Sequence, residues 1–165
     1  MMFERNLNKL AKILKEKKLI AATAESCTGG LLASRLTDVA GSSVYLYESH
    51  ITYANDAKHK YLGVSKEILD NYGAVSEECA RAMAEGLQQL SNCDVAICTT
   101  GIAGPDGGTK EKPVGTVFVS VKYKGQIVVK KFVLKSFIPR KLMKSLFTEK
   151  ALKLAYDVIC EKSAT

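Results

Sequence analysis

The chain has 165 residues, of which 47% are hydrophobic and 25% are charged, the balance typical of a globular protein. No apolar run is long enough to cross a bilayer, and residues 1–19 are too charged for a secretory signal, so we expect a cytoplasmic protein without a membrane partner. The net charge of +7 comes from 24 Lys and Arg against 17 Asp and Glu. The lysines are spread along the chain without a basic stripe interleaved with aromatic residues. This favours a solvated basic surface over a nucleic-acid partner and leaves an anionic small molecule as a ligand.

The chain has an odd number of cysteines and no C-x-x-C pair. The five are Cys27, Cys79, Cys93, Cys98 and Cys160. This spacing argues against a zinc site and against a disulfide framework, and it fits a reducing cytoplasm. We therefore expect neither a metal nor a cofactor.

The periodicity of apolar residues predicts alternating helices and strands over the first 98 residues. In chain order the first predicted elements are an amphipathic helix bearing Phe3, Leu7, Leu10 and Leu14, a strand over 19–23, a helix over 31–39 and a strand over 44–53. A loop over 53–58 then enters a short helix, and a second short helix is opened by Ser65 and ended by Gly73. A helix from Ser76, with Cys79, Met83, Leu87 and Leu90 on one face, and a strand over 95–98 follow. The last strand is uniformly apolar, as expected of a strand that is covered on both faces.

The end of the chain follows a different pattern. Alternating residues over 117–121 predict a strand, Lys124-Gly125 turns the chain, and 127–134 predicts an antiparallel neighbour. Apolar residues from Met143 to Val158 predict a long closing helix. Together with the early alternation, this hairpin predicts an α/β protein, a three-layer α/β/α sandwich around a mixed sheet of about five strands. Because no repeat or linker interrupts it, we expect residues 1–165 to form one domain.

A polar turn with two glycines, Ala24-Glu25-Ser26-Cys27-Thr28-Gly29-Gly30, connects the first predicted strand to the helix after it. The first N–H groups of a helix have no partner within the helix, and the helix dipole is positive there, so a phosphate or an oxyanion is stabilised at this point. Ser26 stands at this position. A simpler interpretation is that Ser26 or Thr28 only caps the helix, and the stretch alone leaves both interpretations open.

A second glycine-rich loop, from Gly101 to Gly108, follows the predicted buried strand. Ligands of open α/β sheets collect outside the carboxyl ends of strands, so the two loops together predict a binding pocket. The loop lacks the Gly-Lys-Ser/Thr ending of a Walker A sequence, and a strand follows it where a dinucleotide fingerprint would have a helix. Its glycines and Pro105 also suit a plain connection, but four glycines, a proline and flanking threonines favour a functional loop.

A serine nucleophile requires a base. His50 lies in the middle of a predicted strand and His59 lies among lysines, so each is more typical of a structural or exposed residue. A lysine serves as a base when desolvation or a positive neighbour lowers its pKa, and Lys58 is placed for that role, although spacing alone does not separate it from the other lysines. Cys27 is a rival nucleophile because a helix N-terminus favours a thiolate, while packing is its commoner role.

Several separate motifs, in the same order, resemble the CinA C-terminal domain family. They are the turn around Ser26, Tyr53-Ala54-Asn55-Asp56-Ala57-Lys58, Gly73-Ala74-Val75-Ser76, Thr100-Gly101-Ile102-Ala103-Gly104-Pro105 and Lys112-Pro113-Val114-Gly115-Thr116. The similarity runs from about Asn6 to the closing helix. The family's fold is a three-layer α/β/α sandwich. Its enzymes include nicotinamide-nucleotide amidohydrolase (NMN deamidase), which converts nicotinamide mononucleotide and water to nicotinic acid mononucleotide and ammonia without a metal, in pyridine nucleotide salvage and NAD metabolism.

The resemblance implies an amidohydrolase with a Ser-Lys mechanism. Ser26 would attack the carboxamide carbon, Lys58 would accept its proton, and water would then hydrolyse the nicotinoyl-serine ester. Tyr53, Asn55 and Thr100 match positions near the family's active site and would orient Lys58 or the amide. The residues that the resemblance places around the substrate, some of them as oxyanion donors, are Glu25, Thr28, Gly29, Gly30, Asn55, Gly101, Gly104, Gly107, Gly108, Arg140 and Lys144.

The chain departs from the family's pattern in two places. Family members usually have Gly-Asp-Arg and a further arginine near the start of the last helix, where this chain reads Phe-Ile-Pro-Arg-Lys-Leu-Met-Lys over 137–144. We expect Arg140 to keep one basic contact with a phosphate, while Lys144 would replace the other without bidentate geometry. Ser49 stands where the family often has glycine. These changes motivate an alternative function, a non-catalytic module of the same fold that binds a nucleotide or a protein, and a homo-oligomer also stays open.

Overall fold

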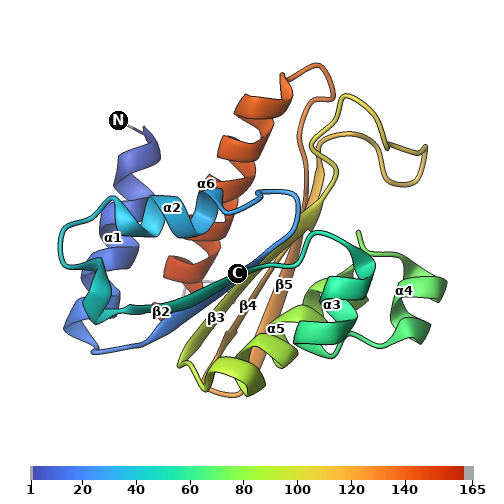
Figure 1. Cartoon of the computed structure of the whole chain (residues 1–165). Helices are drawn as coiled ribbons and strands as arrows, with labels where there is room; N and C mark the ends of the chain where they lie inside the picture. The colour runs from blue at the N-terminus through green and yellow to red at the C-terminus, as the bar shows by residue number, and fades with distance from the viewer. Residues whose placement is uncertain (1, 162–165) are drawn as a thin grey trace.

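A computed structural model describes residues 2–161, with side chains from residue 4 onward. One mixed sheet, in the order β2-β1-β3-β4-β5, forms its centre (Figure 1). Its strands are β1 (Ala21–Glu25), β2 (Leu46–Ile51), β3 (Val95–Gly101), β4 (Thr116–Tyr123) and β5 (Gln126–Val133). β1 runs parallel to β2 and to β3, whereas β4 runs antiparallel to β3 and to β5. The predicted α/β fold with a mixed sheet of five strands is therefore confirmed.

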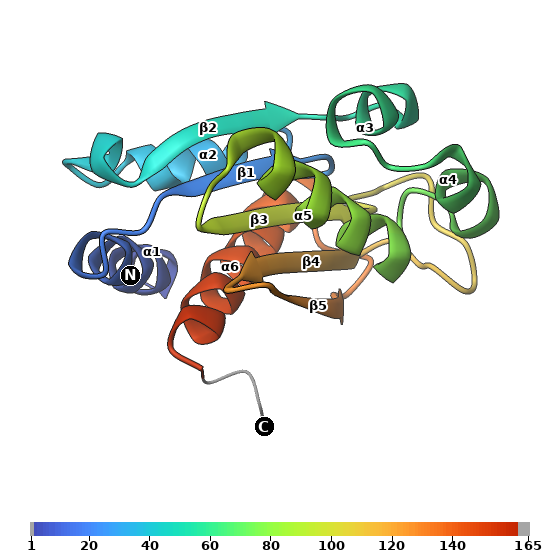
Figure 2. The ribbon, with the colours of Figure 1, turned by 90° about the horizontal axis from the view of Figure 1, so that it is seen from below.

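Helices cover both faces of the sheet (Figures 1 and 2). One layer holds α1 (Met2–Glu16), α2 (Leu31–Thr37) and α6 (Arg140–Ile159), and the other holds α3 (Asn55–Leu62), α4 (Lys66–Tyr72) and α5 (Glu77–Ser91). A large apolar cluster lies between the first layer and the sheet, and a smaller one lies under α5. β3, between them, is buried along almost its whole length, which explains its uniformly apolar sequence. The position predicted for Phe3 lies outside the described side chains.

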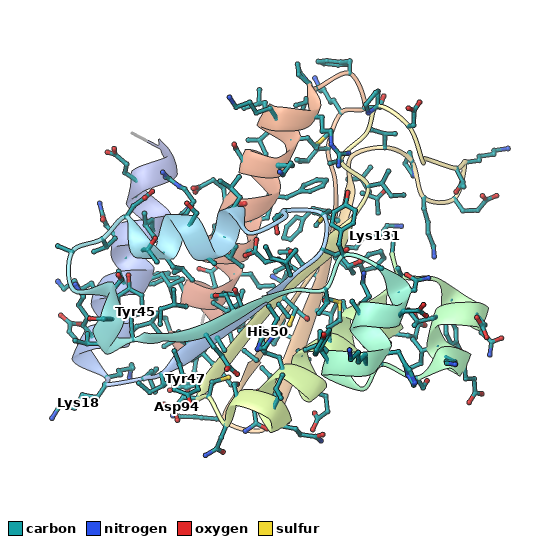
Figure 3. The ribbon with its side chains drawn as sticks, viewed as in Figure 1. Lys18, Tyr45, Tyr47, His50, Asp94 and Lys131 are labelled. Carbon is teal, nitrogen blue, oxygen red and sulfur yellow. The ribbon has the colours of Figure 1, made fainter. Side chains whose placement is uncertain are left out.

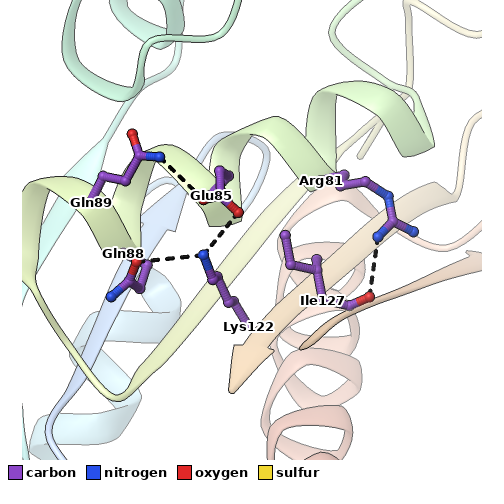
Figure 4. A network of polar contacts seen from close by, with 6 residues as sticks. All are labelled: Arg81, Glu85, Gln88, Gln89, Lys122 and Ile127. Carbon is purple, nitrogen blue, oxygen red and sulfur yellow. Dashed lines mark hydrogen bonds and ion pairs between the residues drawn. The ribbon is translucent and has the colours of Figure 1, made fainter. Parts of the chain in front are cut away.

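A polar network fastens α5 to the antiparallel half of the sheet (Figure 4). Lys122 of β4 forms an ion pair with Glu85 at 2.8 Å, and Arg81 donates a hydrogen bond to the carbonyl of Ile127 at 3.2 Å. α5 in turn packs against α3 so closely that a Cβ added to Gly86 would lie 1.7 Å from the carbonyl oxygen of Leu62. The position of α3 is thus fixed through α5 by the sheet.

Several element boundaries differ from the sequence prediction, among them those of β1, β2 and β3. Residues Ser42–Val44 form a short 3-10 turn, η1, so β2 begins two residues later than predicted. β3 continues to Gly101, because Thr99 and Thr100 still pair with β4. Leu90, at the end of the predicted apolar face of α5, is 49% exposed. Within residues 2–161, no helix is long and apolar enough to span a membrane.

Candidate active site

A buried carboxylate organises the turn that follows β1. Glu25 is fully buried, and its two carboxylate oxygens accept four hydrogen bonds. The donors are the hydroxyl of Thr28 at 2.6 Å and the N–H groups of Gly30 at 3.2 Å, Leu32 at 2.8 Å and Ala33 at 3.0 Å. A carboxylate at this position satisfies the unpaired N–H groups of α2 and complements its dipole. Glu25 therefore occupies the N-terminus of α2, where the sequence predicted a bound phosphate or an oxyanion.

This arrangement corrects two predictions about the turn. Gly30 is the N-cap residue of α2, and no side-chain hydroxyl caps it, so neither Ser26 nor Thr28 has that role. The N–H of Gly29 donates to the carbonyl of Ser26 at 3.0 Å, and that of Gly30 donates to Glu25. These two N–H groups are thus occupied inside the protein, and assigning them to an oxyanion is wrong.

Ser26 and Lys58 meet at the edge of this turn. Ser26 is 9% exposed, and Lys58 is fully buried. The Nζ atom of Lys58 lies 3.1 Å from Oγ of Ser26, 2.8 Å from the carbonyl oxygen of Thr52 and 3.0 Å from that of Tyr53. The short connection after β2 presents these two carbonyls, and the first turn of α3 carries Lys58 back toward them.

The environment of Lys58 suits a proton acceptor. Burial lowers the pKa of its amine, because desolvation disfavours the ammonium form. A neutral amine has two N–H bonds and one lone pair. With the carbonyls of Thr52 and Tyr53 accepting the two N–H groups, the lone pair is left for the hydroxyl of Ser26. Such an amine can take the proton of the serine as its oxygen attacks an electrophile.

The rival groups are engaged elsewhere. His59 Nδ1 lies 2.8 Å from the carbonyl oxygen of Val64, and His50 Nε2 lies 3.4 Å from Oε1 of Glu48. Burial raises the pKa of the Cys27 thiol to about 12, which disfavours a thiolate even beside a helix N-terminus. Of the groups considered from the sequence, Lys58 is the one that contacts Ser26.

A cavity of about 280 Å³ opens in front of Ser26 and Lys58. The residues predicted for the site that line it are Ser26, Tyr53, Lys58, Thr100, Gly101, Gly104, Gly107 and Arg140. Sequence reasoning assigned no role to Ala74, Val75 or Asp106, which also line it. The motif Gly73-Ala74-Val75-Ser76 was the signal for the first two. Thr100 Oγ1 donates a hydrogen bond to the carbonyl of Ala74 at 2.8 Å and holds that segment against β3.

The other predicted residues lie outside the cavity lining: Glu25, Thr28, Gly29, Gly30, Asn55, Gly108 and Lys144. Asn55 is exposed at the start of α3. Gly108 packs within its own loop, where an added Cβ would lie 2.7 Å from the backbone nitrogen of Val114. Lys144 reaches Gly29 instead, since a Cβ added there would lie 3.5 Å from the ammonium nitrogen. These residues do not line the cavity in this structure, so their contact with a ligand stays a prediction.

Arg140, at the start of α6, joins two walls of the cavity. Its guanidinium donates to the carbonyl of Gly104 at 2.7 Å and to the hydroxyl of Tyr53 at 3.0 Å. One contact belongs to the loop after β3 and the other to the connection after β2. A guanidinium has five N–H donors, so these two bonds leave donors that can bind an anionic ligand.

Comparisons with known proteins identify the family of this chain. The sequence matches the CinA C-terminal domain family over residues 4–159. It is 48% identical over 153 residues to a CinA-like protein of Chloroherpeton thalassium, covering 91% of this chain and 36% of that one. It is 50% identical over 123 residues to a CinA-like protein of Geobacter sulfurreducens, covering 74% of this chain and 30% of that one. The chain spans about a third of the length of the curated relatives that it matches.

Solved structures show the same fold. Competence/damage inducible protein CihA from Agrobacterium tumefaciens superposes with a TM-score of 0.90 at 38% identity, covering 93% of each chain. The CinA superfamily protein ECK1530/EC0983 from Escherichia coli superposes with a TM-score of 0.88 at 34% identity, covering 96% of this chain and 90% of that one. With the family match extending over nearly the whole sequence, the chain belongs to the CinA C-terminal domain family.

Proposed function

We propose that the protein is a nicotinamide-nucleotide amidohydrolase that converts nicotinamide mononucleotide and water to nicotinic acid mononucleotide and ammonia. The observation that carries the proposal is the contact between Ser26 and Lys58. A serine hydroxyl lies 3.1 Å from a buried amine whose two other neighbours are carbonyls, at the edge of a cavity. This pairing supplies a nucleophile and its base without a histidine.

In the first half of the proposed reaction, Oγ of Ser26 attacks the carboxamide carbon while Nζ of Lys58 takes the hydroxyl proton. The carbonyl oxygen becomes an oxyanion. Since the N–H groups of Gly29 and Gly30 are occupied, we assign its stabilisation to the N–H of Cys27, the residue after the nucleophile. Lys58 then returns the proton to the amide nitrogen, the carbon–nitrogen bond breaks, and ammonia leaves.

In the second half, water enters at the position that ammonia has left. Lys58 accepts a proton from the water as its oxygen attacks the ester carbon, and the proton returns to Oγ of Ser26 when the ester bond breaks. Tyr53 and Thr100 support this step by position. The carbonyl of Tyr53 holds Lys58, and Thr100 fixes the Ala74 segment that forms the wall of the cavity.

The ligand that we propose carries a phosphate, and the cavity offers a cation for it. Arg140 and Lys58 are the cationic side chains among its lining residues, and Lys58 is fully buried beside Ser26. We therefore assign the phosphate to Arg140 and the carboxamide to Ser26. The thiols of the five cysteines are free, which suits the reducing cytoplasm that we propose as the location.

The proposal is tested by incubating the purified protein with nicotinamide mononucleotide and measuring ammonia and nicotinic acid mononucleotide together. We expect equal amounts of both from the unaltered protein and a loss of about 10³-fold or more in rate for Ser26→Ala. The thermal midpoint should be retained, because the change removes one oxygen beside a cavity. Ser43→Ala, at an exposed position of η1, is the matched control.

Two results would count against the proposal. Equal turnover by Ser26→Ala would remove Ser26 as the nucleophile. Saturable binding of the nucleotide without product, in the unaltered protein, would favour the alternative of a non-catalytic binding module.

A further inference from the structure

A second cavity, of about 310 Å³, lies between α2 and α6. Leu31 and Arg35, one turn apart, come from α2, and Leu142, Ser145 and Glu149 stand at successive turns of α6. Because residues at this spacing share one side of a helix, one face of each helix forms a wall of the cavity. Among the described residues, the lining consists of Leu31, Arg35, Leu142, Ser145, Thr148 and Glu149, none of which lines the candidate active site.

Both helices that form this cavity are held in place. α2 and α6 pack against each other and against the sheet (Figure 1). Glu25 accepts N–H groups at the start of α2, and the fully buried Tyr45 (Figure 3) donates its hydroxyl to the carbonyl of Leu36 near the end of that helix. Arg140 ties the start of α6 to the loop after β3. The cavity therefore belongs to the folded scaffold, as small-molecule sites usually do.

Glu149 brings an unsatisfied polar atom to this cavity. Its side chain is 8% exposed, and its Oε2 accepts a hydrogen bond from the amide of Asn6 at 3.2 Å. Oε1 is buried and has no hydrogen-bond partner among the described residues. The last torsion of a glutamate is broad, so the carboxylate can turn one oxygen toward the cavity while the other keeps the contact with Asn6. Since an unpaired buried oxygen is costly, a ligand that supplies a donor is stabilised there.

The charge of Glu149 is also uncompensated. Burial is the main influence on its carboxyl and raises the pKa, whereas the hydrogen bond from Asn6 and the charge of Arg35 lower it. Arg35 already forms an ion pair with Asp38 at 3.0 Å, and no ion pair joins Glu149 to another described residue. A cation bound in the cavity would therefore gain from this carboxylate.

The remaining walls favour an apolar body on such a cation. The hydroxyls of Ser145 and Thr148 each donate to the backbone carbonyl one turn earlier in α6, at 3.2 and 2.9 Å. Leu31 and Leu142 offer apolar surface from the two helices, and Leu142 is 46% exposed. A ligand that covers these leucines removes apolar surface from water.

We propose that this cavity binds a primary ammonium compound with a small aliphatic body. The ammonium group donates to the carboxylate of Glu149, and the body lies against Leu31 and Leu142. The ligand is held by a charge-assisted hydrogen bond at one end and by apolar contact at the other. The site is separate from the Ser26–Lys58 pair and does not depend on the reaction proposed for it.

The first test is a titration of the purified protein with isoamylammonium, followed by saturation-transfer NMR of the ligand at about pH 8, where an alkylammonium is protonated. We expect saturable binding. Isoamyl alcohol lacks the charge, isovalerate reverses it, and methylammonium lacks the aliphatic body, so each should bind at least about ten-fold more weakly. No saturation by isoamylammonium, or equal or tighter binding of any of these three compounds, would overturn the proposal.

The second test assigns the site to Glu149. Glu149→Gln keeps the size of the side chain and an acceptor for Asn6 but removes the charge, so isoamylammonium should bind at least about ten-fold more weakly. The thermal midpoint should be retained or raised, because the variant no longer buries an uncompensated carboxylate. Glu67→Gln, exposed on α4, is the matched control and should bind like the unaltered protein. Equal binding by Glu149→Gln would place the ligand elsewhere and contradict the assignment.

A change in the apolar wall tests the other end of the ligand. Leu142→Ala removes part of this wall at a side chain that is 46% exposed, so the fold does not depend on it. It should weaken binding of isoamylammonium about five-fold and leave binding of methylammonium unchanged. An equal effect on the two ligands, or none on isoamylammonium, would count against the proposed position of the aliphatic body.

Discussion

Two ionisable side chains, Glu25 and Lys58, are fully buried around the turn after β1, and their hydrogen-bond partners give them different roles. Glu25 faces N–H and O–H donors, which hold it within the scaffold. Lys58 faces two carbonyls and one hydroxyl, and the hydroxyl belongs to Ser26. Burial alone does not identify a reactive residue. What identifies Lys58 is that burial lowers its pKa beside a group that has a proton to lose.

The lowered pKa of Lys58 predicts the pH dependence of the proposed reaction. The neutral amine is the base, so kcat/KM should rise as pH rises and reach a plateau above the pKa of Lys58. That midpoint should lie below the ordinary lysine value of about 10.4. A pH–rate profile of ammonia release measures it. Lys58→Arg, which stays protonated, should lose activity across the whole range, and activity retained by this variant would point to another base.

Glu25→Gln should destabilise the protein without altering the lining of the cavity. The amide replaces one acceptor oxygen by an NH₂ group that meets N–H donors of α2, so we expect a loss of about 3 kcal/mol in the free energy of unfolding. Denaturant unfolding measures this loss. Glu85→Gln, at a partly exposed partner of Lys122, should cost much less. A comparable loss in the two variants would contradict the role assigned to Glu25.

At the scale of elements, the site depends on the contact between α5 and α3. α3 carries Lys58 but is short and has an exposed outer side, so its own packing holds it weakly. α5 is anchored to the sheet by apolar contacts and by the network around Lys122 (Figure 4). Gly86 lets the two helices approach, because an added Cβ would collide with the carbonyl of Leu62.

Gly86→Ala is therefore expected to destabilise the protein, although alanine normally favours a helix. Overpacking at this contact should cost about 2 kcal/mol in the free energy of unfolding, and activity should fall because α3 moves with Lys58. Gly63→Ala, which has open space around it but a left-handed backbone, should cost about 1 kcal/mol and serves as the control. Thermal unfolding together with the ammonia assay distinguishes the two. An unchanged thermal midpoint for Gly86→Ala would contradict this prediction, because it would show that α3 and α5 can move apart without loss of stability.

At the scale of the whole molecule, the cavity is assembled from segments that lie far apart in the sequence. The turn after β1, the connection after β2, the Ala74 segment and the loop after β3 form its walls, and Arg140 joins two of them. The sheet brings these segments together because β1, β2 and β3 are parallel and end at the same edge.

Arg140→Ala tests whether this junction binds the phosphate of the proposed substrate. We expect KM for nicotinamide mononucleotide to rise about 10- to 100-fold with a smaller change in kcat, because a charge-assisted contact is lost away from the reacting carbon. Lys141→Ala, at an exposed neighbouring position of α6, controls for the loss of charge. Steady-state kinetics separates the two constants. A fall in kcat alone would assign Arg140 to positioning the loops and not to binding.

The apolar periodicity and turn residues of the sequence predicted the fold more fully than the site. The start of β2 was predicted too early because Val44, a residue type that favours strands, lies in η1. The end of β3 was predicted too early because threonine, as at Thr99, suits both a strand and a loop. Within the site, Ser26 and Lys58 were predicted as a pair only through the family resemblance. The oxyanion role of Gly30 was wrong because the pattern does not reveal that Glu25 already accepts its N–H.

By itself, the sequence determined the order of helices and strands, the mixed sheet between two helical layers, and the loops in which the candidate residues lie. It did so because alternation, helical periodicity and turn residues record which side of each element is buried. Only the tertiary structure decided that Lys58 meets Ser26, that Glu25 occupies the helix N-terminus, and that Lys144 lies outside the cavity. Those outcomes depend on which donors and acceptors are already paired, and pairing across elements is a property of the folded chain.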